Sequence, residues 1–211
     1  MSDGKFITFE GGEGAGKSTQ VRLLADSLRQ LGHKVIETRE PGGSPGAEAI
    51  RELLVNGGTN RWSGSSESLL NYAARRDHID RTIIPALEEG AWVICDRFAD
   101  STMAYQGYGH ELGAEWVSDL HMLVLGDFKP DLTIVFDIAP EQGLKRANSR
   151  SDTEDRYERM ETSFHDRLRV GFLAIASNEP DRCVVLDASG TIDDIHAQIL
   201  ASVQERLGPN L

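Results

Sequence analysis

The chain has 211 residues, 39% hydrophobic and 27% charged, which suits one compact α/β domain with a substantial core. Its formal net charge of −12 gives no overall attraction to the phosphates of nucleic acid or to an anionic membrane, so we expect neither as a partner. Cys95 and Cys183 lie in apolar runs, which is typical of small buried hydrophobes and indicates neither a disulfide framework nor a metal site. A polar start and the lack of an apolar run of about 18 residues predict a cytoplasmic protein.

The first predicted strand, residues 6–9, leads directly into a phosphate-binding motif. Gly11, Gly16, Lys17 and Ser18 satisfy the pattern G-x-x-x-x-G-K-S/T, and a helical pattern follows at once. Glycines let the backbone N–H groups turn toward phosphate oxygens, and the start of the helix adds its positive dipole end. The motif predicts that Lys17 reaches the phosphates and that the Ser18 hydroxyl binds Mg²⁺. The predicted ATP-binding loop is Gly11, Gly12, Glu13, Gly14, Ala15, Gly16, Lys17, Ser18 and Thr19.

The remaining elements alternate along the chain. We expect further strands over residues 34–38, 92–95, 131–137 and 182–187, and helices over residues 17–31, 47–55, 67–89, 114–125, from Pro140 onward, 164–176 and 192–207. Pro85 is expected to kink its helix. Strands that alternate with helices after a phosphate loop predict an α/β fold of the P-loop NTPase type, a doubly wound five-stranded parallel sheet in a single domain, residues 1–211.

Charged residues follow two of the predicted strands. Arg39 and Glu40 come after the second strand, and Asp96 and Arg97 come after the third. Open α/β sheets bind ligands at the carboxyl ends of their strands, so we expect Asp96 to help hold a metal ion and Arg97 to hold an anion. A solvated ion pair is the alternative for Arg39 and Glu40, and a helix cap is the alternative for Asp96.

A basic segment late in the chain predicts a lid at about residues 146–157. Lys145, Arg146, Arg150 and Arg156 flank a polar stretch, residues 149–155, that lacks hydrophobic periodicity. Such a lid suits a small-molecule kinase that must keep water from the γ-phosphate. A charged surface hairpin is the competing interpretation.

The sequence closely resembles the bacterial thymidylate kinases. The matching stretches are F-E-G-G-E-G-A-G-K-S-T at 9–19, T-R-E-P-G-G at 38–43, Y-A-A-R at 72–75, D-R-F-A-D-S-T-M-A-Y-Q-G at 96–107, G-D-F-K-P-D-L-T at 126–133, G-L-K-R-A at 143–147 and D-R at 155–156. The resemblance implies Mg²⁺-dependent transfer of the ATP γ-phosphate to dTMP, giving dTDP for dTTP synthesis, by a homodimer.

The resemblance also implies roles for individual residues. Glu13 is directed at the sugar 3′-hydroxyl, Arg97 at the acceptor phosphate and Arg75 at the edge of thymine. Asp96 organises the metal ion and its waters. The implied dTMP site comprises Glu13, Arg39, Asn71, Arg75, Arg97, Ser101, Tyr105 and Gln106, and Arg146 is assigned to ATP.

Members of that family divide by where the catalytic arginine sits, and two features of this chain bear on its place among them. Its phosphate loop contains no arginine, so we expect the lid to supply the catalytic one, Arg150 or Arg156. Asn71 occupies the position at which family members commonly stack a phenylalanine on thymine, which leaves base choice open. The alternatives are a kinase of another pyrimidine monophosphate, such as dUMP, and a nucleotide-binding regulator without turnover.

Overall fold

The computed structural model describes residues 4–148 and 156–208. Five parallel strands form one sheet in the order β2-β3-β1-β4-β5, so the strand that leads into the phosphate loop is central. The strands are β1 (Lys5–Gly11), β2 (Val35–Arg39), β3 (Trp92–Asp96), β4 (Leu132–Asp137) and β5 (Cys183–Asp187). The expected five-stranded parallel sheet is confirmed.

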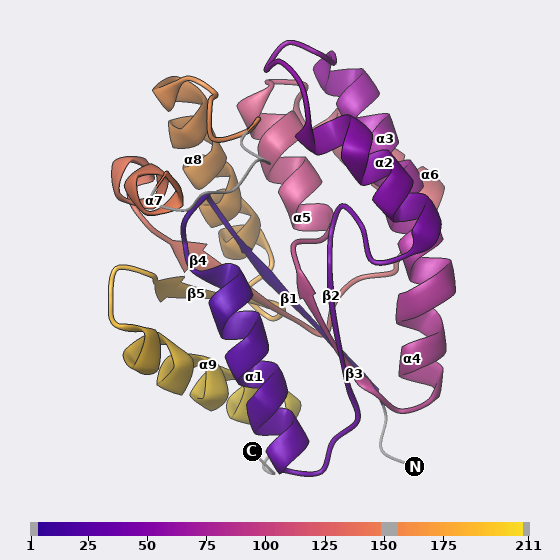
Figure 1. The fold of residues 1–211 in the computed structure, drawn as a ribbon, viewed down its shortest axis with the longest axis vertical. Helices are drawn as coiled ribbons and strands as arrows, with labels where there is room; N and C mark the ends of the chain where they lie inside the picture. Colours follow the sequence, from indigo (N-terminus) through magenta and orange to yellow (C-terminus); the bar gives the residue numbers. More distant parts are fainter. Residues whose placement is uncertain (1–3, 149–155, 209–211) are drawn as a thin grey trace.

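Helices cover both faces of this sheet (Figure 1). They are α1 (Lys17–Gln30), α2 (Pro45–Val55), α3 (Gly64–His78), α4 (Ile84–Glu88), α5 (Ala99–Thr102), α6 (Ala114–Leu125), α7 (Pro140–Ala147), α8 (Thr162–Asn178) and α9 (Ile192–Leu207), with π-helical segments η1 (Ile79–Ile83) and η2 (Met103–Gly109). Among the described residues, no helix is long and apolar enough to cross a membrane.

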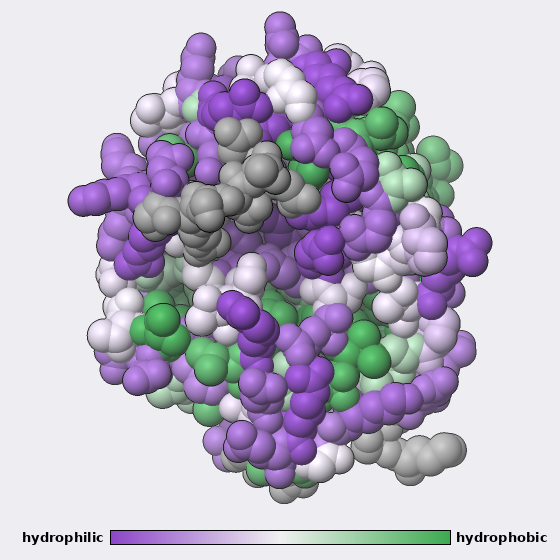
Figure 2. Space-filling model, in the orientation of Figure 1, coloured by the Kyte–Doolittle hydropathy of each residue, from purple (hydrophilic) through white to green (hydrophobic). Residues whose placement is uncertain are grey.

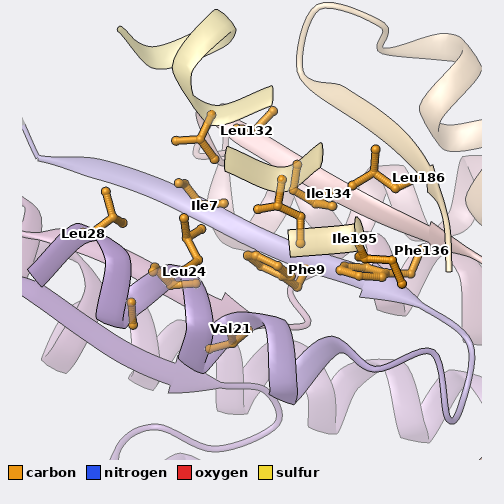
Figure 3. Packing of buried hydrophobic residues seen from close by; sticks show 14 of the residues in the cluster. Ile7, Phe9, Val21, Leu24, Leu28, Leu132, Ile134, Phe136, Leu186 and Ile195 are labelled. Carbon is orange, nitrogen blue, oxygen red and sulfur yellow. The ribbon is translucent and has the colours of Figure 1, made fainter. Parts of the chain in front are cut away.

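Alternation along β1 divides its side chains between the two faces of the sheet. Ile7 and Phe9 point to the face that α1 and α9 cover, where they join Leu24 and Ile199 in one buried cluster (Figure 3). Phe6 belongs to a different cluster on the opposite face. The central strand is therefore buried on both sides, as its nearly continuous apolar sequence predicts.

The long helix expected over residues 67–89 is present but interrupted. It begins earlier, at Gly64, because Ser63 caps it by accepting a hydrogen bond from the Ser66 amide. The π-helical turn η1 separates α3 from α4, directly before the turn that contains Pro85. A proline cannot donate the next helical hydrogen bond, which explains why the regular pattern breaks here.

Candidate active site

The phosphate loop connects β1 to α1 and curls around the Lys17 side chain. Lys17 Nζ donates to the carbonyls of Gly11, 3.1 Å away, and Gly12, 2.8 Å away. Gly14 has a φ of +65°, and a Cβ at this position would lie 1.9 Å from the Gly143 carbonyl oxygen of α7. Burial, together with nearby Arg97, lowers the pKa of Lys17 to about 8. The loop thus places a desolvated cation where phosphate oxygens would bind.

Ser18 and Asp96 lie together at the carboxyl edge of the sheet. Phe9 of β1 pairs with Asp96 of β3, which brings the end of β3 beside the loop. The Ser18 hydroxyl donates to Asp96 Oδ2 over 2.5 Å. Both are hard oxygen ligands of the kind that Mg²⁺ prefers, so the pair fits a magnesium site that shares its ligands with a nucleotide. Within residues 4–148 and 156–208, no cluster of three or more His, Cys, Asp or Glu side chains could hold a metal by itself.

Glu13 and Arg97 form an ion pair beside the loop. Arg97 Nη2 lies 3.1 Å from Glu13 Oε1, and the Tyr105 hydroxyl donates to the same oxygen. Burial opposes the charge on Glu13, but Arg97 and Lys17 outweigh it and lower its pKa. Arg97 Nη1 donates to the Gly11 carbonyl over 2.9 Å, which ties this arginine to the phosphate loop. An arginine fixed by carboxylate and carbonyl partners is prepared to receive an anion without reorganising.

Arg97 adopts a left-handed backbone conformation, with φ of +72°, which is uncommon outside glycine. Glu10, buried beneath it in β1, accepts hydrogen bonds from the Phe98 amide at 2.7 Å and from the Ser101 amide at 3.2 Å and hydroxyl at 2.5 Å. Burial, with Asp100 nearby, raises the pKa of Glu10 to about 7. Glu10 therefore fixes the turn that aims Arg97. The sequence reasoning missed this residue, although a carboxylate inside an apolar strand was a signal.

A cavity of about 230 Å³ joins these groups. Thirteen of its lining residues were predicted to belong to the site: Glu13, Gly14, Ala15, Gly16, Lys17, Ser18, Arg39, Asn71, Asp96, Arg97, Ser101, Tyr105 and Gln106. Seven were not: Glu40, Pro41, Arg51, Val55, Thr102, Tyr157 and Glu158. Arg51 of α2 lines the cavity and donates to the Pro41 carbonyl over 2.7 Å. A helical pattern cannot reveal this contact, because it depends on how α2 packs beside the turn after β2.

Arg75 was expected at the base but lies behind the cavity wall. Its side chain is buried, with Nε 2.7 Å from Glu40 Oε2 and both terminal nitrogens 3.1 Å from Thr102 Oγ1. The rings of Tyr72 and Phe98 lie 4.7 and 5.3 Å from its guanidinium carbon. Arg75 is not among the cavity-lining residues, so its contact with a base stays a prediction.

The three arginines of the expected lid differ in their surroundings. Arg146 donates to the carbonyls of Ala188 and Ser189, over 2.8 and 3.3 Å. Arg156 is fully buried, and its guanidinium contacts Glu67 and main-chain carbonyls of residues 54, 58 and 59. Arg156 is not among the residues that line the cavity, so its catalytic role stays a prediction. Arg150 lies outside the described residues.

The remaining predicted loop residues are Gly11, Gly12 and Thr19. They belong to the strand end, the loop and the first turn of α1, and they do not line the cavity.

One cavity is lined by the phosphate loop that follows the central strand, by the oxygens of Ser18 and Asp96, and by Arg97. This arrangement is that of a P-loop nucleotide-binding phosphotransferase. A model of the family described as thymidylate kinase matches residues 9–199. The chain belongs to the thymidylate kinase family.

Individual relatives cover nearly the whole chain. The chain is 59% identical over 208 residues to a thymidylate kinase from Caulobacter vibrioides, a match that covers 99% of this chain and 100% of that protein. It is 49% identical to one from Ruegeria pomeroyi, covering 97% of this chain and 96% of the relative. The crystal structure of thymidylate kinase from Ehrlichia chaffeensis superposes with a TM-score of 0.77 at 35% identity, over 96% of this chain and 99% of that one.

Proposed function

We propose that the chain transfers the γ-phosphate of ATP to the 5′-phosphate of dTMP, giving ADP and dTDP. The observation that carries this proposal is that Lys17, at the donor loop, and the Glu13–Arg97 pair face a single cavity. A donor phosphate bound to Lys17 and an acceptor phosphate bound to Arg97 would repel one another less, because each is next to a positive charge. Their reacting atoms would also be aligned. Family membership supports the choice of dTMP.

Mg²⁺ is the metal ion we propose, held by Ser18 and Asp96 together with nucleotide phosphates. When bound, it neutralises charge that develops on the phosphate oxygens during transfer. The carboxylate and hydroxyl of this pair already lie within hydrogen-bonding distance.

We further propose that the chain acts in the cytoplasm as a homodimer through the apolar faces of α2, α3 and α6. Large hydrophobic side chains are exposed there: Leu53, Leu69, Trp116, Met122 and Leu123. Figure 2 shows hydrophobic surface gathered at the right-hand edge, where Figure 1 places α6 and α3. An exposed apolar surface shared by neighbouring helices is typical of a subunit interface.

The function is tested by Mg²⁺–ATP phosphotransfer to dTMP, dUMP, dCMP, dGMP and thymidine. We expect the highest kcat/KM with dTMP, and Lys17→Ala serves as the background because it removes the buried loop cation. A higher kcat/KM for another monophosphate would keep the phosphoryl-transfer chemistry but reject dTMP. Turnover no faster than that of Lys17→Ala with every acceptor would reject the kinase function altogether.

A further inference from the structure

A second cavity lies apart from the one that holds the proposed active site, which we call the acceptor cavity. The second cavity has a volume of about 330 Å³, against about 230 Å³ for the acceptor cavity. Clefts of about 300 to 1,000 Å³ are the usual size of sites for small organic ligands. None of the described residues predicted for the active site lines the second cavity, so the proposed phosphotransfer leaves it without a role.

Aromatic side chains form much of the lining of the second cavity. Tyr72 of α3 and Phe98, just before α5, are almost fully buried there. Tyr108 of η2 and His121 of α6 add two more rings, and Met103 adds a thioether. Aromatic rings and thioethers pack favourably on the faces and edges of another ring. The lining therefore suits a flat aromatic ligand.

The charged groups of this lining are paired with one another. Arg182 Nη1 lies 2.6 Å from Asp100 Oδ2, and Arg182 Nη2 lies 2.8 Å from Glu179 Oε1. Lys129 Nζ lies 3.9 Å from Glu179 Oε2. Burial lowers the pKa of His121, so its ring is neutral at pH 7. The two cations and two anions cancel, and a charged ligand would lose hydration without gaining a counter-ion of its own.

Neutral polar side chains complete the lining. Ser118 of α6 and Asn178 of α8 are both exposed, and each can donate and accept hydrogen bonds. His121 Nδ1 lies 3.3 Å from the Tyr72 hydroxyl. Such groups recognise ring nitrogens and ring carbonyls, so the flat ligand that fits this cavity is a heterocycle.

The short helix α5 forms the wall between the two cavities, and it packs between α3 and α8 (Figure 1). Residues 99–100 line the second cavity, whereas residues 101–102 line the acceptor cavity. The Ser101 amide and hydroxyl donate to Glu10, which fixes the turn that aims Arg97. A ligand in the second cavity therefore packs against the helix that holds the acceptor site in place.

A second connection between the cavities runs through α3. The Tyr72 ring lies 4.7 Å from the guanidinium carbon of Arg75. Arg75 Nη2 donates to the Phe98 carbonyl over 3.0 Å, and its Nε donates over 2.7 Å to Glu40, which lines the acceptor cavity. Tyr72 and Phe98 thus belong both to the lining of the second cavity and to the network behind the acceptor site.

We propose that the second cavity is a binding site for an uncharged planar heterocycle, of the size of a purine base or its nucleoside, whose binding strengthens binding of the acceptor. Both cavities exist in one conformation, so a ligand that fills the second stabilises the arrangement of α5 that the acceptor requires. The site itself stands independently of the proposed function. Its effect on the acceptor rests on that function, through the choice of dTMP.

The test of the site titrates purine and purine riboside into protein saturated with Mg²⁺–ADP, which fills the donor site, and follows the methionine methyl groups by NMR. Met103 and Met122 line the second cavity, and Met160 lines neither cavity. We expect ring-current shifts at Met103 and Met122 with Met160 unchanged. The tighter of the two ligands shows whether a free base or a nucleoside fills the site. No shift at Met103 or Met122 with either ligand at about 5 mM would overturn the proposal.

The charge of the ligand is tested with purine riboside 5′-monophosphate under the same conditions. Its phosphate carries negative charge into a lining whose cations are already paired, so we expect binding at least about tenfold weaker than that of the riboside. Equal affinity of the two would overturn the choice of an uncharged ligand.

The link to the acceptor site is tested by calorimetry. Coupling between two sites is reciprocal, so dTMP should tighten purine binding by the same factor by which purine tightens dTMP binding, and we expect about fivefold. Displacement of purine by dTMP would place purine in the acceptor cavity and overturn the proposal. An unchanged Kd would overturn the coupling. If dTMP binds but is never phosphorylated, the kinase function fails while these titrations still decide the second site.

A variant that fills the cavity completes the test. Ser118→Trp adds an indole ring to the lining from an exposed position on α6, and Ala201→Trp, at an exposed position on α9, is the matched control. We expect Ser118→Trp to weaken purine binding at least about tenfold and Ala201→Trp to leave it unchanged. Equal purine affinity in the two folded variants would place the binding elsewhere and overturn the proposal.

Discussion

Lys17 holds a positive charge at a site where burial works against it. Its pKa of about 8, below the ordinary 10.5, means that the ligand-free protein loses this cation as the pH rises through 8. Bound phosphate favours the protonated form of Lys17. The lysine therefore loses its charge near pH 8 only in the enzyme without bound nucleotide. We predict that kcat/KM for ATP falls tenfold per pH unit above about pH 8, whereas kcat falls only at higher pH.

A pH–rate series from 6.5 to about 9.5 at constant ionic strength checks this prediction. Lys17→Arg is the control, because arginine stays charged in this range and its profile, at whatever lower activity, should lack the decline. A wild-type profile that stays flat to pH 9.5 would show that Lys17 is not the group responsible.

Asn71 lies on the cavity wall and offers no aromatic face to a base. We predict that Asn71→Phe lowers KM for dTMP about tenfold, because stacking a base on an aromatic ring is worth about 1 to 3 kcal/mol. The hydrogen bond lost is one to a main-chain carbonyl within α3, so stability should change little. Steady-state kinetics with dTMP, with Asn71→Leu as a control for added apolar area, separates stacking from burial. Equal KM values for the two variants would reject the stacking explanation.

Some functional residues could be identified from the sequence and others could not. The difference is whether a residue's role can be recognised from its neighbours in the sequence or depends on partners far along the chain. Lys17, Ser18 and Asp96 could be predicted, because a local motif and the end of a strand carry their chemistry. Glu10 acts through the Phe98 amide, 88 residues later. The Glu67 carboxylate contacts Gln106 and Arg156, neither of which is near it in sequence. Such roles depend on tertiary packing, which no local spacing reveals. Arg156, expected at the phosphates, joins this buried cluster for the same reason.

At the scale of elements, the phosphate loop is packed against α7. The Gly14 position allows no Cβ, since one would lie 1.9 Å from the Gly143 carbonyl oxygen, and its φ is +65°. In the reverse direction, a Cβ on Gly143 would lie 2.4 Å from the Glu13 carbonyl oxygen. Two glycines facing one another therefore set the distance between the loop and this helix.

We predict that Gly14→Ala destabilises the ligand-free protein by about 2 kcal/mol or more, because the left-handed conformation and the close contact both oppose a side chain. Thermal unfolding without nucleotide should show a Tm at least about 4 °C lower. Gly12→Ala is the matched control in the same loop, since a Cβ there meets nothing within 4 Å. Equal Tm values for the two variants would contradict the packing argument.

The boundaries of helices were easiest to predict where one uninterrupted run of helical hydrophobic spacing covers the whole element. The helices at residues 114–125 and 192–207 agree with the structure at both ends. The π-helical turns η1 and η2 could not be predicted, because the spacing of hydrophobic residues does not reveal where hydrogen bonding changes from the α-helical to the wider π-helical pattern. The turn η2 carries Tyr105 and Gln106, so this irregularity helps position the site.

For the whole molecule, the alternating pattern predicted a parallel sheet of five strands but not its order. The order β2-β3-β1-β4-β5 places β3 and β4 on either side of β1, so the ends of three adjacent strands surround the loop. The register between β1 and β3 pairs Phe9 with Asp96. This places Asp96 beside the loop that follows β1, where it contacts Ser18. The same packing leaves large hydrophobic side chains exposed on α2, α3 and α6, the helices that we propose form the dimer interface.

Leu123 is 83% exposed on α6, the most exposed of the large hydrophobic side chains among the described residues. We predict that Leu123→Asp converts the protein from dimer to monomer at micromolar concentration, because a charge at the centre of an apolar interface loses its hydration without gaining a partner. Sedimentation velocity measures the change directly. Val170→Asp on α8 is the matched control, since Val170 is 59% exposed but lies outside the α2–α3–α6 surface. A dimer that survives Leu123→Asp, or one that Val170→Asp disrupts instead, would place the interface elsewhere on the molecule.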